Sequence, residues 1–149
     1  MVRRFGFIIV IAVIAIGGFV LRDRLSSNPT DLKVGDCFDS PTAIGQTVND
    51  VQHHPCSESH TGEVFAVVTN PAGDKAIYPD ENARQTFIVS VCTQPFKDYV
   101  GGDIATTSLD VKFFTPTVDG WTNGDRSFTC YVTNTDNSPF TKSIKNSGL

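Results

Sequence analysis

The sequence predicts a small α+β domain preceded by an N-terminal transmembrane helix: a small antiparallel sheet, one kinked helical segment packed on it, and two disulfides. Three observations predict this architecture. An apolar run opens the chain, four later segments have the residue pattern of strands around one segment with helical spacing, and all four cysteines follow the apolar run. A chain of 149 residues has room for one such domain after its first segment.

Residues 5–21, FGFIIVIAVIAIGGFVL, contain no charged side chain. A helix of this stretch is about 25 Å long, near the short end of what spans a bilayer core, and flanking arginines can extend it by snorkelling. Arg3 and Arg4 precede the run, and Arg22 and Arg24 follow it. The positive start and the short tail favour an N-in orientation. We therefore expect a single-pass protein of the cell membrane: a cytoplasmic tip and anchor over 1–24, a linker over 25–30, and a domain outside the cytoplasm over 31–149.

Two alternatives compete with this anchor. A cleaved signal peptide has the same charged start, and Ala15-Ile16-Gly17 is its only passable cleavage site, but apolar residues continue beyond it. A buried helix is the other alternative. No cysteine directly follows the run, so a lipid-modified N-terminus is not supported. Both the anchor and the signal peptide export the rest of the chain.

The exported part is acidic. From Asp31 onward eight Lys/Arg stand against fifteen Asp/Glu, a formal net charge of −7. Nucleic acid is excluded as a partner because no basic patch is available to neutralise phosphates. Repulsion from anionic lipid or wall polymer is also expected, which suits a domain held away from the membrane by the linker LSSNPT.

All four cysteines, Cys37, Cys56, Cys92 and Cys130, lie in the exported part, where an even count predicts two disulfides. Three pairings are formally possible. We favour Cys37–Cys56, at the ends of one β-excursion, with Cys92–Cys130, which ties the helical segment to the last strand. Each bond should stabilise the domain by about 3 to 4 kcal/mol.

Four segments are predicted as strands. Alternation of apolar and polar residues indicates 32–38, a β-branched run bounded by Gly62 indicates 62–69, and one-face patterns indicate 109–115 and 127–133. The last two should be neighbouring antiparallel strands, joined by a loop that contains the turn-forming pair Asn123-Gly124.

Pro79-Asp80-Glu81 has the residues typical of a helix N-terminus. Apolar residues then recur at helical spacing, so one face can pack on the sheet. Pro95 should interrupt or kink this helix, and Gly101-Gly102 should end it. The competing interpretation is a strand over 86–91, which is rich in β-branched residues.

The stretch HHPCSESHTGEVFAVV, residues 53–68, is the first place to look for chemistry. His60 and Glu63 lie three apart, but without the spacing that identifies a zinc site, and Cys56 has no thiolate if it is disulfide-bonded. Ser57 and Ser59 lack the G-x-S-x-G setting of a hydrolase nucleophile. We therefore expect no catalytic residue, no metal and no cofactor, and keep His60 and Glu63 as candidate ligand or partner contacts.

A second set of candidate contacts is Trp121, Asp125 and Arg126. The only tryptophan beside an arginine in a loop is suited to a sugar or peptide contact, through aromatic stacking and bidentate hydrogen bonding. The alternative is that Trp121 covers the edge of the core while Asp125 or Arg126 closes the loop.

Several motifs resemble those of the septum-formation domain family, found in membrane-anchored proteins of actinobacteria. They cover about residues 31–147 and are LKVGDCF at 32–38, PCxxxHxxEVFAVV at 55–68, a cysteine followed by F-x-x-Y-x-G at 92–101, FxPT at 114–117, W-x-x-GDR-x-x-x-C at 121–130, and a Ser-hydrophobic-Lys tail at 143–145. The chain departs from the family pattern at Ser59, where proline is common.

The resemblance implies a non-enzymatic domain of the cell envelope outside the cytoplasm, with a link to division-septum formation. It brings no catalytic residues. The expected function is an anchored interaction or sensory domain, with envelope or division proteins as partners; the oligomeric state is open. The alternative is a small envelope hydrolase or metal-binding protein that uses His60 and Glu63.

Overall fold

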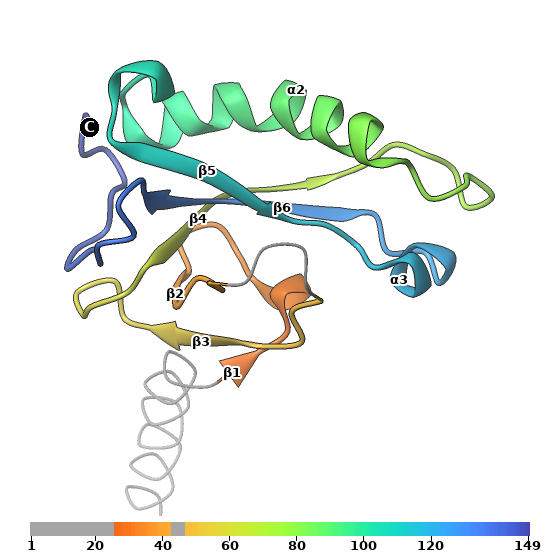
Figure 1. Ribbon diagram of the computed structural model, residues 1–149, viewed down its shortest axis with the longest axis horizontal. Helices are drawn as coiled ribbons and strands as arrows, with labels where there is room; N and C mark the ends of the chain where they lie inside the picture. Colours follow the sequence, from red (N-terminus) through yellow and green to blue (C-terminus); the bar gives the residue numbers. More distant parts are fainter. Residues whose placement is uncertain (1–25, 43–46) are drawn as a thin grey trace, which may run out of the picture.

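A computed structural model describes residues 26–42 and 47–149. The described residues form a six-stranded antiparallel sheet with one long helix on one face (Figure 1). The strand order is β1-β3-β2-β4-β6-β5. The strands are β1 Ser26–Ser27, β2 Cys37–Phe38, β3 Val51–His54, β4 Gly62–Thr69, β5 Leu109–Phe114 and β6 Ser127–Asn134. The predicted α+β class, with a small antiparallel sheet, a packed helix and two disulfides, is confirmed.

The three long strands lie where the sequence predicts them. β4 has the predicted bounds, and β5 and β6 differ from them by one residue each at the C-terminal end. β6 pairs with β5 on one side and β4 on the other, so it is the central long strand. A bulge between Val64 and Ala66 interrupts the register of β4 with β6. It lets the consecutive residues Phe65 and Ala66 contribute to the same apolar cluster, where a regular strand would place them on opposite faces.

The predicted strand over 32–38 is wrong except for its last two residues. A 3-10 turn, η1 Pro29–Asp31, precedes it, and Gly35 has a φ of +92°, which an extended strand does not contain. Gly35 N–H donates to the Val64 carbonyl and Val64 N–H donates to Asp36, so this turn is fastened to β4. The alternation did not reflect one buried face, because Leu32 is buried while Val34 is 53 % exposed.

Helix α2 Glu81–Val100 confirms the helical prediction and excludes the strand over 86–91. The Asp80 side chain accepts the Ala83 N–H at the N-terminus, and Gly101, with φ +85°, ends the helix in the left-handed conformation. Pro95 does not interrupt it. The helix continues for five residues beyond Pro95 although proline has no N–H to give the Val91 carbonyl.

Two apolar clusters lie on opposite faces of the sheet. The larger fills the space between α2 and the long strands; its buried aromatic residues are Phe65, Phe96, Tyr99, Trp121, Phe128 and Phe140. The smaller lies on the other face, where Phe38 packs against Phe114 and Tyr131. Val64 belongs to the smaller cluster, whereas Phe65 and Ala66 belong to the larger. Both faces of β4 are therefore covered over residues 62–66, which explains the apolar residues there, whereas Val67 is 39 % exposed.

Both predicted disulfides are present. Cys37–Cys56 joins β2 to the loop after β3, and Cys92–Cys130 joins α2 to β6 through the larger cluster. The linked cysteines are 19 and 38 positions apart in the sequence. The first holds the small strands β2 and β3 in place, and the second fixes α2 on the sheet.

The predicted transmembrane helix at residues 5–21 lies outside the described residues. Within residues 26–42 and 47–149, no helix has the length and apolar character needed to cross a membrane. Part of the predicted linker is structured, however. Ser26 and Ser27 pair with β3, and the Ser27 hydroxyl lies 2.5 Å from His53 Nε2. Two residues of the range predicted as a linker, 25–30, therefore form a strand of the sheet.

Two further elements were missed by the sequence patterns. β3, VQHH, has too few residues to show alternation, and it is positioned by pairing with β2. Helix α3 Val118–Thr122 occupies the loop between β5 and β6, and the Thr117 side chain caps it by accepting the Gly120 N–H. The predicted turn pair follows directly: Asn123 ends α3, and Gly124 has a φ of +94°.

Candidate functional site

Glu63 lies at the start of β4 and has no exposed surface. It pairs with Cys37 of β2 on one side and Val132 of β6 on the other. Its side chain lies on the face that α2 covers, next to the last turn of that helix, since it bonds to Tyr99. A carboxylate in this position must be compensated by its surroundings.

Three donors compensate the Glu63 carboxylate. The Tyr99 hydroxyl donates to Oε1 at 2.7 Å, the Ser143 hydroxyl donates to Oε1 at 2.6 Å, and the Ile144 N–H donates to Oε2 at 2.9 Å. Ser143 and Ile144 belong to the C-terminal segment, eighty residues away along the chain. Glu63 therefore connects the sheet, α2 and the C-terminal segment through one side chain.

The pKa of Glu63 lies below its ordinary value. Burial raises this pKa, but the interactions with the His60 ring, Ser143, Tyr99 and the Ile144 N–H lower it and together outweigh the burial. Burial and the adjacent Glu63 carboxylate raise the pKa of Tyr99, so its hydroxyl stays protonated and donates. Because the pKa of Glu63 is lowered on folding, the carboxylate adds stability above its unfolded pKa, near 4.5, and this stability is lost as the pH falls through the folded pKa.

His60 is also fully buried, just before β4. Its backbone exchanges two hydrogen bonds with Phe140, and the two rings lie 5.6 Å apart. Nδ1 lies 2.8 Å from the Glu58 carbonyl, so Nδ1 carries the proton and donates. Nε2 has no hydrogen-bond partner and lies 3.8 Å from Glu63 Oε2. A buried imidazole nitrogen without a partner is unusual in a folded protein.

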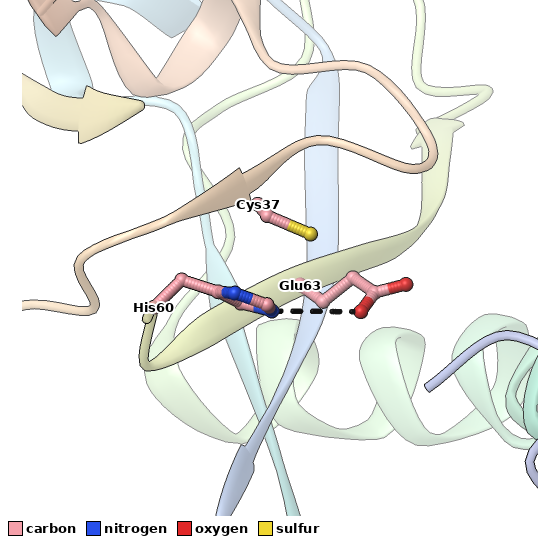
Figure 2. A group of neighbouring side chains, drawn as sticks. All are labelled: Cys37, His60 and Glu63. Atoms are coloured by element: carbon pink, nitrogen blue, oxygen red, sulfur yellow. Dashed lines mark ion pairs between the residues drawn. The ribbon is translucent and has the colours of Figure 1, made fainter. Parts of the chain in front are cut away.

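Cys37 completes a buried group with His60 and Glu63 (Figure 2). One donor atom from each of the three residues lies within 4.8 Å of the other two. The Cys37 side chain extends from β2 toward the other two residues (Figure 2). In the disulfide, however, the Cys37 sulfur is no thiolate and offers no strong bond to a metal. The group therefore holds two metal-ligand side chains rather than three while Cys56 is attached.

Trp121 and Arg126 form a separate structural unit at the other end of the long strands. The Arg126 guanidinium stacks on the Trp121 ring at 3.9 Å from its centroid. It donates to the carbonyls of Trp121, Asp125 and the loop residues 72–74, while Trp121 Nε1–H donates to the Ala76 carbonyl at 2.8 Å. These bonds fasten the loop between β4 and α2 to α3.

Asp125 has a local role beside them, because its carboxylate accepts the Ser127 N–H at 2.9 Å. Trp121 and Arg126 are 3 % and 8 % exposed, so a sugar or peptide could stack on neither without displacing the loop. This arrangement is the loop-closing alternative raised from the sequence.

The two sets of candidate residues do not meet. Glu63 pairs with Val132, whereas Thr69, at the far end of β4, pairs with Ser127. Six residues of strand separate these points by about 20 Å. The structure thus brings His60 to Glu63, and Trp121 to Arg126 and Asp125, but it leaves the two sets at opposite ends of one strand pair.

Tyr99 and Ser143 are the site residues that sequence reasoning missed. Both were within recognised motifs, the F-x-x-Y-x-G segment and the Ser-hydrophobic-Lys tail, but neither was assigned a role. The available signal was an acid within a β-branched run: such an acid needs hydrogen-bond donors when it is buried, and the tyrosine and serine of these two motifs can supply them.

No curated protein and no solved structure matches the chain. A family model described as "Septum formation" matches residues 34–148, which is most of the chain. This range contains both disulfides, Glu63 with all its partners, and the Trp121–Arg126 unit. The chain therefore belongs to the septum-formation family.

Proposed function

We propose that this protein is a membrane-anchored, non-catalytic interaction or sensory domain of the cell envelope, outside the cytoplasm, that acts in septum formation. Membership of the septum-formation family supports the link to division and the envelope. The apolar run at 5–21, the net charge of −7 after it and the two disulfides support the compartment.

The main support for a non-catalytic role is that Glu63 and His60, the polar groups that an enzyme would expose to substrate, are buried. Glu63 and His60 have no exposed surface, and three donors occupy the carboxylate. A general base must reach a substrate atom within hydrogen-bond distance, and neither group does so. The burial of both groups therefore supports the non-catalytic proposal over the hydrolase alternative.

The surface most suited to a partner is an apolar tip, which we define as Ile77 and Val118. Ile77 is 89 % exposed and Val118 is 59 % exposed. The segments that carry them are fastened together, because Trp121 of α3 donates to Ala76 and the Tyr78 hydroxyl donates to the Pro116 carbonyl. Because these hydrogen bonds hold the two segments in place, little backbone ordering is needed on binding, which favours a protein contact.

We expect a photoreactive amino acid at position 77 to crosslink a division or wall-synthesis protein in cells. The matched control is position 89, because Val89 is also exposed, at 57 %, but lies on the outer side of α2. The measurement is mass spectrometry of crosslinked products from repeated cultures. The proposal would be overturned if position 77 crosslinked no division or wall-synthesis protein and a deletion strain formed normal septa.

Reporter fusions test whether the C-terminal domain lies outside the cytoplasm. A reporter that works only outside the cytoplasm should be active when fused after Leu149, and a reporter that works only inside should be silent. The same fusions to a chain without residues 1–24 serve as the control, and there the pattern should reverse. Activity inside the cytoplasm with the full chain would contradict the N-in orientation and with it the oxidising compartment.

A further inference from the structure

The unpartnered Nε2 of His60 is the strongest unexplained feature among the described residues. The Nδ1–H bond to the Glu58 carbonyl leaves Nε2 facing Glu63 Oε2, at 3.8 Å, and the Cys37 sulfur. This is how a metal-binding histidine is held, since its other ring nitrogen almost always donates to a carbonyl or carboxylate. The ring is therefore oriented as a ligand, although the oxidised group lacks a third donor.

Reduction of Cys37–Cys56 would supply that donor. A dithiol reductant transfers two electrons, so the S–S bond breaks, Cys37 and Cys56 become thiols, and the reductant becomes a disulfide. Cys56 is partly exposed while Cys37 is 1 % exposed, so the reductant thiolate attacks the Cys56 sulfur and Cys37 is the leaving group. The sulfur released is thus the one that lies beside His60 and Glu63.

A released Cys37 thiolate needs a positive charge. Thiolate and carboxylate would then be buried within 4.8 Å of each other, and two like charges are costly there. A Zn²⁺ ion neutralises both charges and accepts the Nε2 lone pair, and its usual ligands are Cys sulfur, His nitrogen and carboxylate oxygen. Donor atoms around a tetrahedral zinc lie about 3.5 Å apart, so contraction by about 1 Å closes the site. Loss of the disulfide constraint permits a shift of this size.

We propose that Cys37, His60 and Glu63 form a redox-gated zinc site: the oxidised protein holds no metal there, and the reduced protein binds one Zn²⁺ through these three side chains. Binding replaces the thiol proton of Cys37 by the metal and releases that proton to water. Either the disulfide or the metal would then stabilise the same part of the sheet, where β2 pairs with β4. This inference does not depend on the proposed function.

Two matched variants of the full chain test the site without a reductant. Cys56→Ser frees the Cys37 thiol, whereas Cys37→Ser frees the Cys56 thiol, and both lose the same disulfide and keep Cys92–Cys130. In competition titrations with a chromogenic chelator, Cys56→Ser should bind one equivalent of Zn²⁺. The Zn²⁺ affinity of Cys37→Ser should be lower by about tenfold or more. In the Cys56→Ser background, His60→Ala should cost about tenfold or more in affinity, while His54→Ala should change it little.

Cobalt and folding give two further measurements. Co²⁺ added to Cys56→Ser should produce a thiolate-to-metal absorption band that His60→Ala weakens. If Cys56→Ser is unfolded without metal, Zn²⁺ should restore its near-ultraviolet circular dichroism, because binding free energy becomes folding free energy. Equal affinity of Cys37→Ser and Cys56→Ser would overturn the proposal. A Cys56→Ser variant that gains neither metal nor structure, or stoichiometric zinc on the oxidised wild type, would overturn it too.

Discussion

Replacing Glu63 with alanine is expected to lower the free energy of unfolding by about 3 to 5 kcal/mol, because the change leaves two buried donors and one partly buried donor without an acceptor. These donors are the hydroxyls of Tyr99 and Ser143 and the Ile144 N–H. The C-terminal segment should detach first, since two of the three bonds come from it. Denaturant unfolding of the oxidised chain gives the free energy, and hydrogen exchange at Ile144 gives the local effect.

Two control variants separate burial from charge. Asp50→Ala removes an exposed carboxylate and should change the free energy by about 0.5 kcal/mol or less. Glu63→Gln keeps the shape but not the charge, and its deficit relative to wild type should be greatest at neutral pH. That deficit should shrink as the pH falls below about 4.5, because protonation then removes the carboxylate from the wild type as well. A Glu63→Ala variant as stable as Asp50→Ala would contradict the role of Glu63 in holding the three segments together.

The sequence pattern left His60 and Glu63 as candidate ligand or partner contacts, a role that requires exposure, and both side chains are fully buried. Charged and polar residues are usually exposed, so the pattern alone favoured the surface. The burial depends on the C-terminal segment, which returns to the sheet and covers Glu63 with Ser143 and Ile144. Contacts between residues eighty positions apart leave no local pattern, and only the family motifs marked both ends.

The elements that were predicted well are those with strong local signals. α2 has an acidic N-cap and a glycine C-cap, and β4 and β6 have long one-face or β-branched runs. The elements that were missed or misplaced are short and depend on their neighbours. β2 has two residues and β3 has four, and they are held by pairing and by the Cys37–Cys56 bond rather than by their composition.

The Trp121 loop shows how a functional pattern can have a structural cause. Tryptophan beside arginine suits ligand stacking, and here the stacking is internal, with the guanidinium 3.9 Å from the ring centroid. The loop carbonyls that Arg126 binds come from residues 72–74, more than fifty positions away. The same arrangement leaves the Ile77 side chain exposed, and no sequence pattern pointed to this residue.

Loss of the Cys37–Cys56 bond is the second large effect. Cys37→Ser, Cys56→Ser and the double variant should each lose about 2 to 5 kcal/mol of unfolding free energy, measured by denaturant titration with a metal chelator present. All three break the same bond, so the double variant should resemble the singles rather than show the sum of two losses. Cys37→Ser should be the least stable single variant, because Cys37 is 1 % exposed and its serine hydroxyl is buried between β3 and β4.

The same series distinguishes a disulfide scaffold from a histidine-centred site. His54→Ala is the control for histidine removal, since His54 is partly exposed and its Nε2 lies 2.9 Å from the exposed Asp39 carboxylate, and its effect should stay near 0.5 kcal/mol. Thiol counting and mass mapping of the oxidised wild type should find no free thiol and the peptides 37–56 and 92–130 linked. Additive losses in the double variant would show that the two cysteines act separately, and a 37–92 linkage would reject the pairing itself. With the chelator replaced by Zn²⁺, the two single variants should separate, because only Cys56→Ser retains the sulfur that lies beside His60 and Glu63.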